Sequence, residues 1–522
     1  MVAKLLRACA LPALLLAAGA AEAQVWRSDQ GDQTYRNPPL NADYPDPDII
    51  RVGDIFYFVT TTFANSPGLT ILESRDLVNW RIATHVVPRI DGHPRYDLKE
   101  GGAYRQGLFA ASLRHHRGRF HIAVTPVGLN TRIYSADRIA GPWSHVELDR
   151  AAFDPALFFD DDGKAYLATS IGSDGTITLL TLSPDLRSVQ ASRKIHYVKG
   201  AEGSKIIKRG GWYYIFNAIP SRLGMTVSRA RNLPGPWETR DQIDDRTGGH
   251  QGALVDLPDG GWYGFVMRDA GAIGRVTNIS PVFWQDDWPV WGTPEAPGRV
   301  PASARKPIQG NPFAEPPGSD DFTAPVLGLQ WQWNHNPENA RWSLTERRGY
   351  LRLRPTVSQD LWSARNTLLQ KGQAPRGRGV VKLDIAQVQP GDRCGFGTFG
   401  KYSGQIVVTG TGGGGHAISM ELTESTQEGP RTQVRAAAQP IAGTRLWLRA
   451  DMDFITDRAQ LAYSMDGRSW HEMGDAFPLA FDWRTGTFQG QQFAIACYSP
   501  TPSRGYLDVD SFTLSAIPQG TK

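Results

Sequence analysis

Cysteine is scarce in this sequence, which has three in 522 residues. So few cysteines exclude a disulfide scaffold and do not make a cysteine-ligated zinc site. Cys9 lies close to the N-terminus, which leaves Cys394 and Cys497 in the body of the chain. These two can pair in an oxidising compartment, and the sequence alone leaves that pairing open.

An excess of one charge and long apolar runs are also missing. The chain has 56 Lys and Arg against 52 Asp and Glu, a formal net charge of +4, and no basic run stands out. Charge therefore gives no reason to expect nucleic acid as a partner. Beyond residue 23 no segment is long and apolar enough to cross a bilayer, so we expect no membrane partner. The oligomeric state is left open.

The N-terminus has the features of a cleavable export signal. Lys4 and Arg7 supply positive charge, and residues 8–18 form an apolar stretch that is too short to span a bilayer. Ala21-Glu22-Ala23 matches a small-x-small cleavage site, so we expect a signal peptide over residues 1–23. The mature protein is then secreted or periplasmic.

Turn residues are plentiful, with 55 Gly and 36 Pro, and no strong helical period is visible. A Gly-x-x-aromatic signature occurs five times, at intervals of about 45 to 65 residues, which is the period of propeller blades. Each copy joins a tight turn to alternating apolar residues and so predicts a hairpin. The copies begin at Gly53, Gly118, Gly163, Gly210 and Gly260, and in the Gly118 copy His121 takes the aromatic place. We expect an all-β protein with a five-bladed β-propeller over residues 24–295.

A second domain is expected after the propeller. Residues 296–319 are rich in proline and lack periodicity, which is typical of a linker. From residue 320 to 522 short alternating segments resume, and their spacing predicts a β-sandwich. Such segments lie at residues 350–354, 380–384, 446–451 and 506–514.

Three acidic residues stand at the leading edges of different blades. Asp46 lies between two prolines before the first repeat, and Asp154 and Glu202 enter the third and fourth. Each alone fits a turn or a cap. In a propeller the innermost strand leads each blade, so the three carboxyl groups can converge at one end of the channel. Convergent carboxyl groups supply the acid and base that glycoside hydrolysis needs, and a third negative charge keeps the acid protonated.

Longer motifs resemble glycoside hydrolase family 43. They are NPPLNADYPDPDIIRVGDIFYFVTTTF, FDPALFFDDDGKAYLA, GAEGSKIIKRGGWYYIF, GGHQGALV and GRVTNISPVFWQDDWP, in the family's order. The later segment SDDFTAPVLGLQWQWNHNP resembles the start of the concanavalin-like jelly-roll domain that follows many of the family's β-xylosidases. The resemblance covers almost the whole mature chain.

The resemblance implies a role for each acid. Asp46 matches the general base, Glu202 the general acid, and Asp154 the aspartate that orients the acid and raises its pKa. The family inverts the anomeric carbon, so its base activates a water molecule and no covalent intermediate forms.

Four more positions match the family's site. Arg275 matches an arginine that reaches the sugar, and Phe63 an aromatic wall of the same subsite. Phe109 stands where many relatives have Trp-Ala-Pro, and here Phe109-Ala110-Ala111 makes a smaller wall. His250 matches a channel histidine that sits beside a calcium ion in some members, although a turn or core histidine fits its sequence as well. No cofactor is expected for the chemistry, and a structural calcium in the channel is the metal that the resemblance suggests.

The function expected is that of an exo-acting, inverting glycoside hydrolase. It would release xylose or arabinose from plant cell-wall xylan or arabinoxylan oligosaccharides, and β-D-xylosidase activity is favoured. α-L-Arabinofuranosidase activity with the same machinery and a non-catalytic sugar-binding propeller are the alternatives. The sandwich could anchor the enzyme to polymer, or it could close the pocket with an aromatic from residues 483–488.

Overall fold

The computed structural model describes residues 24–518, apart from 100–101, 103–104, 244–248 and 486–487. The export signal expected over residues 1–23 lies outside the described residues. Within them the chain is all-β, and helix is confined to short 3-10 turns. These turns are η1 (Pro94–Asp97), η2 (Pro220–Arg222), η3 (Gly271–Ile273), η4 (Asn339–Arg341) and η5 (Trp483–Thr485). No helix in the described ranges is long and apolar enough to cross a membrane.

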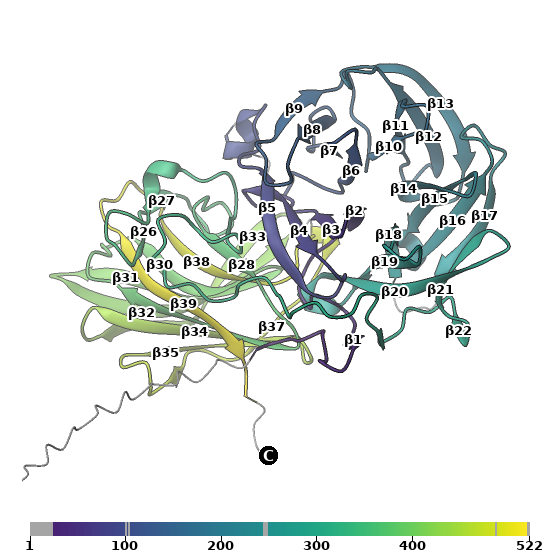
Figure 1. Ribbon diagram of the computed structural model, residues 1–522. Coiled ribbons are helices and arrows are strands. Elements are labelled where there is room, and N and C mark those ends of the chain that lie inside the picture. Colours follow the sequence, from purple (N-terminus) through teal and green to yellow (C-terminus); the bar gives the residue numbers. More distant parts are fainter. Residues whose placement is uncertain (1–23, 100–101, 103–104, 244–248, 486–487, 519–522) are drawn as a thin grey trace, which may run out of the picture.

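The N-terminal domain is a β-propeller with five blades among the described residues, which confirms the predicted repeat (Figure 1). The first blade contains β2 (Asp48–Val52), β3 (Ile55–Thr60), β4 (Gly68–Ser74) and β5 (Trp80–Val87). The second contains β6 (Ser112–His116), β7 (Arg119–Val124), β8 (Arg132–Ala136) and β9 (Ser144–Glu147). The third contains β10 (Ala156–Phe159), β11 (Ala165–Thr169), β12 (Thr176–Leu182) and β13 (Val189–Tyr197).

The last two blades follow the same order. The fourth contains β14 (Glu202–Arg209), β15 (Trp212–Ile219), β16 (Gly224–Ala230) and β17 (Glu238–Ile243). The fifth contains β18 (Gly249–Asp256), β19 (Trp262–Asp269), β20 (Arg275–Gln285), β21 (Trp288–Thr293) and β22 (Ala296–Pro297). In every blade the first strand lies nearest the channel, so residues that enter β2, β6, β10, β14 and β18 approach one another (Figure 1).

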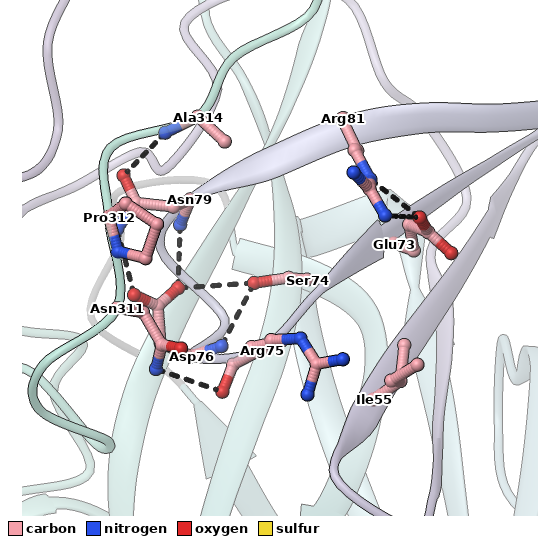
Figure 2. A pocket seen from close by; sticks show the side chains of 10 residues that line it. All are labelled: Ile55, Glu73, Ser74, Arg75, Asp76, Asn79, Arg81, Asn311, Pro312 and Ala314. Carbon is pink, nitrogen blue, oxygen red and sulfur yellow. Dashed lines mark hydrogen bonds and ion pairs between the residues drawn. The ribbon is translucent and has the colours of Figure 1, made fainter.

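The proline-rich segment 296–319 packs against the propeller. Its strand β23 (Ser303–Arg305) pairs with β1 (Thr34–Arg36) near the N-terminus. The Lys306 ammonium then bridges two buried carboxylates, with Asp29 at 2.7 Å and Asp76 at 3.0 Å. Beyond it, Asn311, Pro312 and Ala314 border a cavity of about 170 Å³ beside Asp76 in the first blade (Figure 2). Buried charge pairing therefore fastens this segment to the first blade.

The C-terminal domain is a β-sandwich of two eight-stranded antiparallel sheets, apart from one short parallel pair, as expected. One sheet contains β24 (Gln332–Trp333), β27 (Thr356–Val357), β28 (Leu368–Lys371), β30 (Arg393–Phe399), β31 (Tyr402–Gly412), β32 (Gly415–Thr426), β33 (Gly429–Ile441) and β38 (Gln492–Ser499). The other contains β25 (Trp342–Ser343), β26 (Leu351–Leu353), β29 (Arg376–Asp384), β34 (Arg445–Asp453), β35 (Arg458–Ser464), β36 (His471–Glu472), β37 (Phe477–Pro478) and β39 (Leu507–Ala516). Cys394 in β30 and Cys497 in β38 are opposite each other and form a disulfide, the pairing that the sequence left open.

The two domains are joined by backbone contacts. Ser66 and Trp333 exchange backbone hydrogen bonds of 3.0 and 2.6 Å, and the Asn336 side chain donates to the Ile90 carbonyl at 2.8 Å. Such bonds fix the sandwich against the first blade. The sandwich can therefore contribute side chains to a site on the propeller.

Candidate active site

The three predicted carboxyl groups enter the channel from three blades. Asp46 precedes β2, Asp154 precedes β10, and Glu202 is the first residue of β14. Asp46 and Asp154 have φ of 53° and 44°, in the left-handed region that few non-glycine residues adopt. Such backbone conformations persist where the surrounding structure enforces them, and they cluster at functional sites.

One cavity of about 510 Å³ collects these side chains. Asp46, Asp154 and Glu202 line it together with the predicted residues Arg275 and Phe109. The predicted channel residue His250 lines it as well. The remaining lining residues come from both domains and are Ala110, Phe153, Pro220, Ser221, Leu223, Gln251, Met267, Asp269, Phe481, Trp483 and Phe488. Trp483 and Phe488 belong to the stretch proposed to close the pocket.

Arg275 orients the Asp46 carboxylate. Its guanidinium Nη1 lies 3.1 Å from Asp46 Oδ1, and Nη2 lies 3.5 Å from Oδ2. Both side chains are buried, so the paired geometry is held without competition from solvent. The Arg275 guanidinium Nε is buried and has no hydrogen-bond partner among the described residues.

The pKa values of Asp154 and Glu202 are both raised, so the two carboxyl groups together retain a proton more readily than isolated carboxyl groups do. Burial raises the pKa of Asp154 well above its ordinary value, and the charges of Asp46 and Glu202 raise it further. Burial also raises the pKa of Glu202, while a hydrogen bond from the Gly172 backbone N–H lowers it. A Cβ at Gly172 would lie 2.7 Å from Glu202 Oε2, so a side chain at this position would displace the Glu202 carboxyl group. Electrostatic interaction between two carboxyl groups is one way in which a general acid keeps its proton near neutral pH.

An aromatic cluster forms one wall, and it places Phe63 differently from the prediction. The Phe109 ring lies 5.0 Å from Phe63 and 5.5 Å from Phe488, both in edge-on geometry. Phe63 is fully buried and is not among the residues that line the cavity. It packs behind Phe109 and Phe488, with the Arg275 guanidinium 5.4 Å from its ring. Phe63 thus supports the wall, and Phe109 and Phe488 form its surface.

Known proteins resemble this chain over both domains. The sequence model for glycosyl hydrolases family 43 matches residues 35–289, and that for the β-xylosidase C-terminal concanavalin A-like domain matches residues 319–515. A β-xylosidase of Formosa agariphila is 31% identical over 93% of this chain and 91% of its own length. The chain belongs to glycosyl hydrolases family 43.

Solved structures of family 43 proteins superpose on both domains. One, described as a family 43 glycoside hydrolase engineered to display both endo-xylanase and exo-arabinofuranosidase activity, has a TM-score of 0.85 and 31% identity. The alignment covers 93% of this chain and 100% of that one. A bifunctional GH43-CE protein of Bacteroides eggerthii has a TM-score of 0.84 and 33% identity over 93% of this chain and 64% of its own. This family 43 chain is therefore a glycoside hydrolase.

His250 is the position at which the resemblance suggested calcium. Its Nε2 lies 3.1 Å from Asp269 Oδ1, and its Nδ1 is buried without a hydrogen-bond partner in the described part of the chain. Calcium takes six to eight oxygen ligands. No group of three His, Cys, Asp or Glu side chains able to hold a metal is found among the described residues. The protein side chains therefore do not fit a calcium ion by themselves, and calcium stays a prediction on which no catalytic step depends.

Several residues of the family 43 site were not anticipated from the sequence. Asp269 ends β19 and faces His250, while Leu223 and Ser221 come from the loop that contains η2. Phe481 lies just before the stretch proposed to close the pocket. No local motif marks these positions, because each reaches the cavity only through the packing of the fifth blade, the fourth blade or the sandwich.

Proposed function

We propose that this family 43 enzyme is an exo-acting, inverting β-D-xylosidase. Its substrate would be plant cell-wall xylan or arabinoxylan oligosaccharide, and it would release single xylose units. The observation that carries this proposal is the cavity in which carboxyl groups from three blades meet beside Arg275. The β-xylosidase among its relatives supports the choice of sugar.

The mechanism assigns one task to each carboxyl group. Glu202 is protonated and donates to the glycosidic oxygen as the bond to the anomeric carbon breaks. Asp46 holds its orientation through Arg275 and, as the base, removes a proton from the water that attacks the opposite face of the sugar. Asp154 and Glu202 interact electrostatically. We assign the proton of the pair to Glu202 and the negative charge to Asp154, an arrangement that favours the protonated acid.

The sandwich supports release from a chain end. Phe481, Trp483 and Phe488 line the same cavity as the catalytic carboxyl groups, so the sandwich completes a pocket that the propeller alone would leave open. A pocket with a closed wall accepts the end of an oligosaccharide, whereas an open cleft accepts its middle. This placement favours a pocket-building role for the sandwich over a role as a distant anchor.

Hydrolysis of two nitrophenyl glycosides tests the proposed activity. The mature protein should release nitrophenol from 4-nitrophenyl β-D-xylopyranoside faster than from 4-nitrophenyl α-L-arabinofuranoside. NMR of the first products should show α-xylose, because inversion converts the β-linkage. A large preference for the arabinofuranoside would make the enzyme an arabinofuranosidase. Binding of xylo-oligosaccharide without turnover would instead indicate a non-catalytic propeller.

The pH dependence tests Asp154. Activity should fall as pH rises through the raised pKa of the Asp154–Glu202 pair, because the acid then loses its proton. Asp154→Asn removes one negative charge, so the pKa of Glu202 falls and the basic limb of kcat/KM moves to lower pH. Asp160→Asn is the control, since Asp160 lies in the same blade and bonds Lys208 and Tyr213 away from the cavity. A basic limb that stays in place in Asp154→Asn would contradict this role.

We propose further that the protein is exported after cleavage behind Ala23. The Cys394–Cys497 disulfide supports this, because such bonds persist in oxidising compartments. The intact mass of protein recovered from the periplasm or the medium of a Gram-negative host should correspond to a chain that starts at Gln24. A mass that includes residues 1–23 would contradict cleavage.

A further inference from the structure

Asp43 lies behind the cavity and contacts both domains. Its side chain is buried, and its Oδ1 accepts a hydrogen bond of 2.8 Å from the Arg275 backbone N–H. Its Oδ2 accepts a bond of 3.0 Å from the backbone N–H of Gly490, which belongs to the sandwich. One carboxylate thus joins the start of β20 in the propeller to the segment that precedes β38.

The segment around Asp43 contacts both the backbone and the guanidinium of Arg275. The Tyr44 backbone N–H donates to the Arg275 carbonyl at 3.1 Å, next to the bond that Asp43 accepts. Three residues beyond Asp43, the Asp46 carboxylate binds the guanidinium of the same arginine. Arg275 is therefore fixed at its backbone by Asp43 and Tyr44 and at its side chain by Asp46.

The contact with the sandwich leaves no space for side chains. A Cβ at Gly490 would lie 1.8 Å from the Ile273 carbonyl oxygen, and one at Gly274 would lie 2.4 Å from Asp43 Oδ1. Gly274 also has φ of 96°, a conformation that favours glycine. Phe488, whose ring lines the cavity, lies two residues before Gly490. The position of this ring therefore depends on how Gly490 is held.

A lysine of the sandwich, Lys371, offsets the negative charge of Asp43. Burial raises the pKa of Asp43, while the charges of Lys371 and Arg275 lower it. Lys371 ends β28, and its ammonium lies 5.0 Å from the Tyr44 ring. A buried carboxylate that accepts two backbone N–H groups is stable only while those partners stay in place.

We propose that Asp43 is a positioning residue that couples docking of the sandwich to the geometry of Arg275 and Asp46. It does not touch the reacting atoms in this arrangement. It makes the placement of Phe488 and the orientation of the Asp46–Arg275 pair depend on one carboxylate. The inference rests on the proposed hydrolase function and adds a residue to its machinery.

Asp43→Asn tests the coupling with little change in shape. The amide keeps one acceptor but presents N–H₂ to the second backbone N–H, so one of the two bonds is lost. We expect kcat/KM for xylobiose to fall about tenfold to hundredfold, because small displacements of catalytic groups have effects of that size. Asp29→Asn is the matched control, since Asp29 is also buried and paired with a lysine, Lys306, away from the cavity. It should lower the Tm and leave kcat/KM within about twofold.

A double-mutant cycle separates positioning from loss of stability. Phe488→Ala should lower kcat/KM on its own, and clearly less when Asp43→Asn is already present, because the ring is then no longer held in place. Assays run well below the Tm of each variant, and Asp43→Ser replaces Asp43→Asn if the latter does not fold. The proposal would be overturned if the double variant lost kcat/KM by the product of the factors measured for Phe488→Ala and Asp43→Asn alone. An Asp43→Asn enzyme as active as wild type would also overturn it. A wild type that cleaves no substrate would instead overturn the hydrolase function.

Discussion

Glu202→Gln is expected to lower kcat on xylo-oligosaccharide about a hundredfold or more, and kcat on 4-nitrophenyl β-D-xylopyranoside much less. A sugar alkoxide is a poor leaving group and needs the proton from Glu202, whereas nitrophenolate leaves readily without one. Gln keeps the size of the side chain and its contact with the Gly172 N–H but has no acidic proton to give. Steady-state kinetics on both substrates measure the difference.

The dependence on leaving group identifies the acid. Glu238→Gln is the control, because Glu238 lies on the outer strand of the same blade and pairs with Arg229. It should leave both rates within about twofold, as substitutions at the surface usually do. Equal losses on the two substrates in Glu202→Gln would mean that Glu202 does not protonate the leaving group.

Asp46→Asn is expected to lower kcat by about a thousandfold or more on both substrates alike. The base acts on the attacking water and not on the leaving group, so an activated nitrophenol cannot compensate for its loss. Asn retains an oxygen for the Arg275 guanidinium, which preserves much of the pocket. Binding of xylobiose, measured by calorimetry, should therefore change far less than kcat.

A buried acid two residues along the chain serves as the comparison. Asp48 accepts hydrogen bonds from the Arg114 guanidinium at 2.8 Å and the Leu113 backbone N–H at 2.9 Å, and it is not among the residues that line the active-site cavity. Asp48→Asn should lower the Tm and reduce kcat only modestly, since it breaks a buried pair without removing a base. If Asp46→Asn lost activity only on xylo-oligosaccharide, Asp46 would be acting on the leaving group and its assignment as base would be wrong.

The fold was predictable from sequence because its signals are local. Each blade repeats a tight turn, as at Gly53 with φ of 60°, and an alternating pair of strands whose register places apolar residues on both faces. Both the five blades and the sandwich follow from such periodicity. The position of the acids also followed from the repeat, because the first strand of each blade lines the channel.

Pairings between distant segments were not predictable in the same way. Phe63 ends a strand motif that suggested a wall, yet Phe109 and Phe488 cover it. Asp43 lies in the same motif as Asp46. The sequence of this motif does not show that the Asp43 carboxylate accepts hydrogen bonds from the backbone N–H groups of residues 275 and 490. Segment 296–319 had the composition of a linker, and its strand β23 finds its partner β1 almost 270 residues earlier in the chain.

The sequence by itself determined the two β domains, the family and the carboxyl groups that enter the channel, because turns, strand alternation and motif order are encoded within short stretches. Only the tertiary structure decided that the sandwich completes the pocket, that Cys394 pairs with Cys497, and that Asp43 joins Arg275 of the propeller to Gly490 of the sandwich. Those contacts join residues 100 to more than 400 positions apart. Their energies depend on burial and on the exact approach of two surfaces, and no local pattern of residue types carries that information.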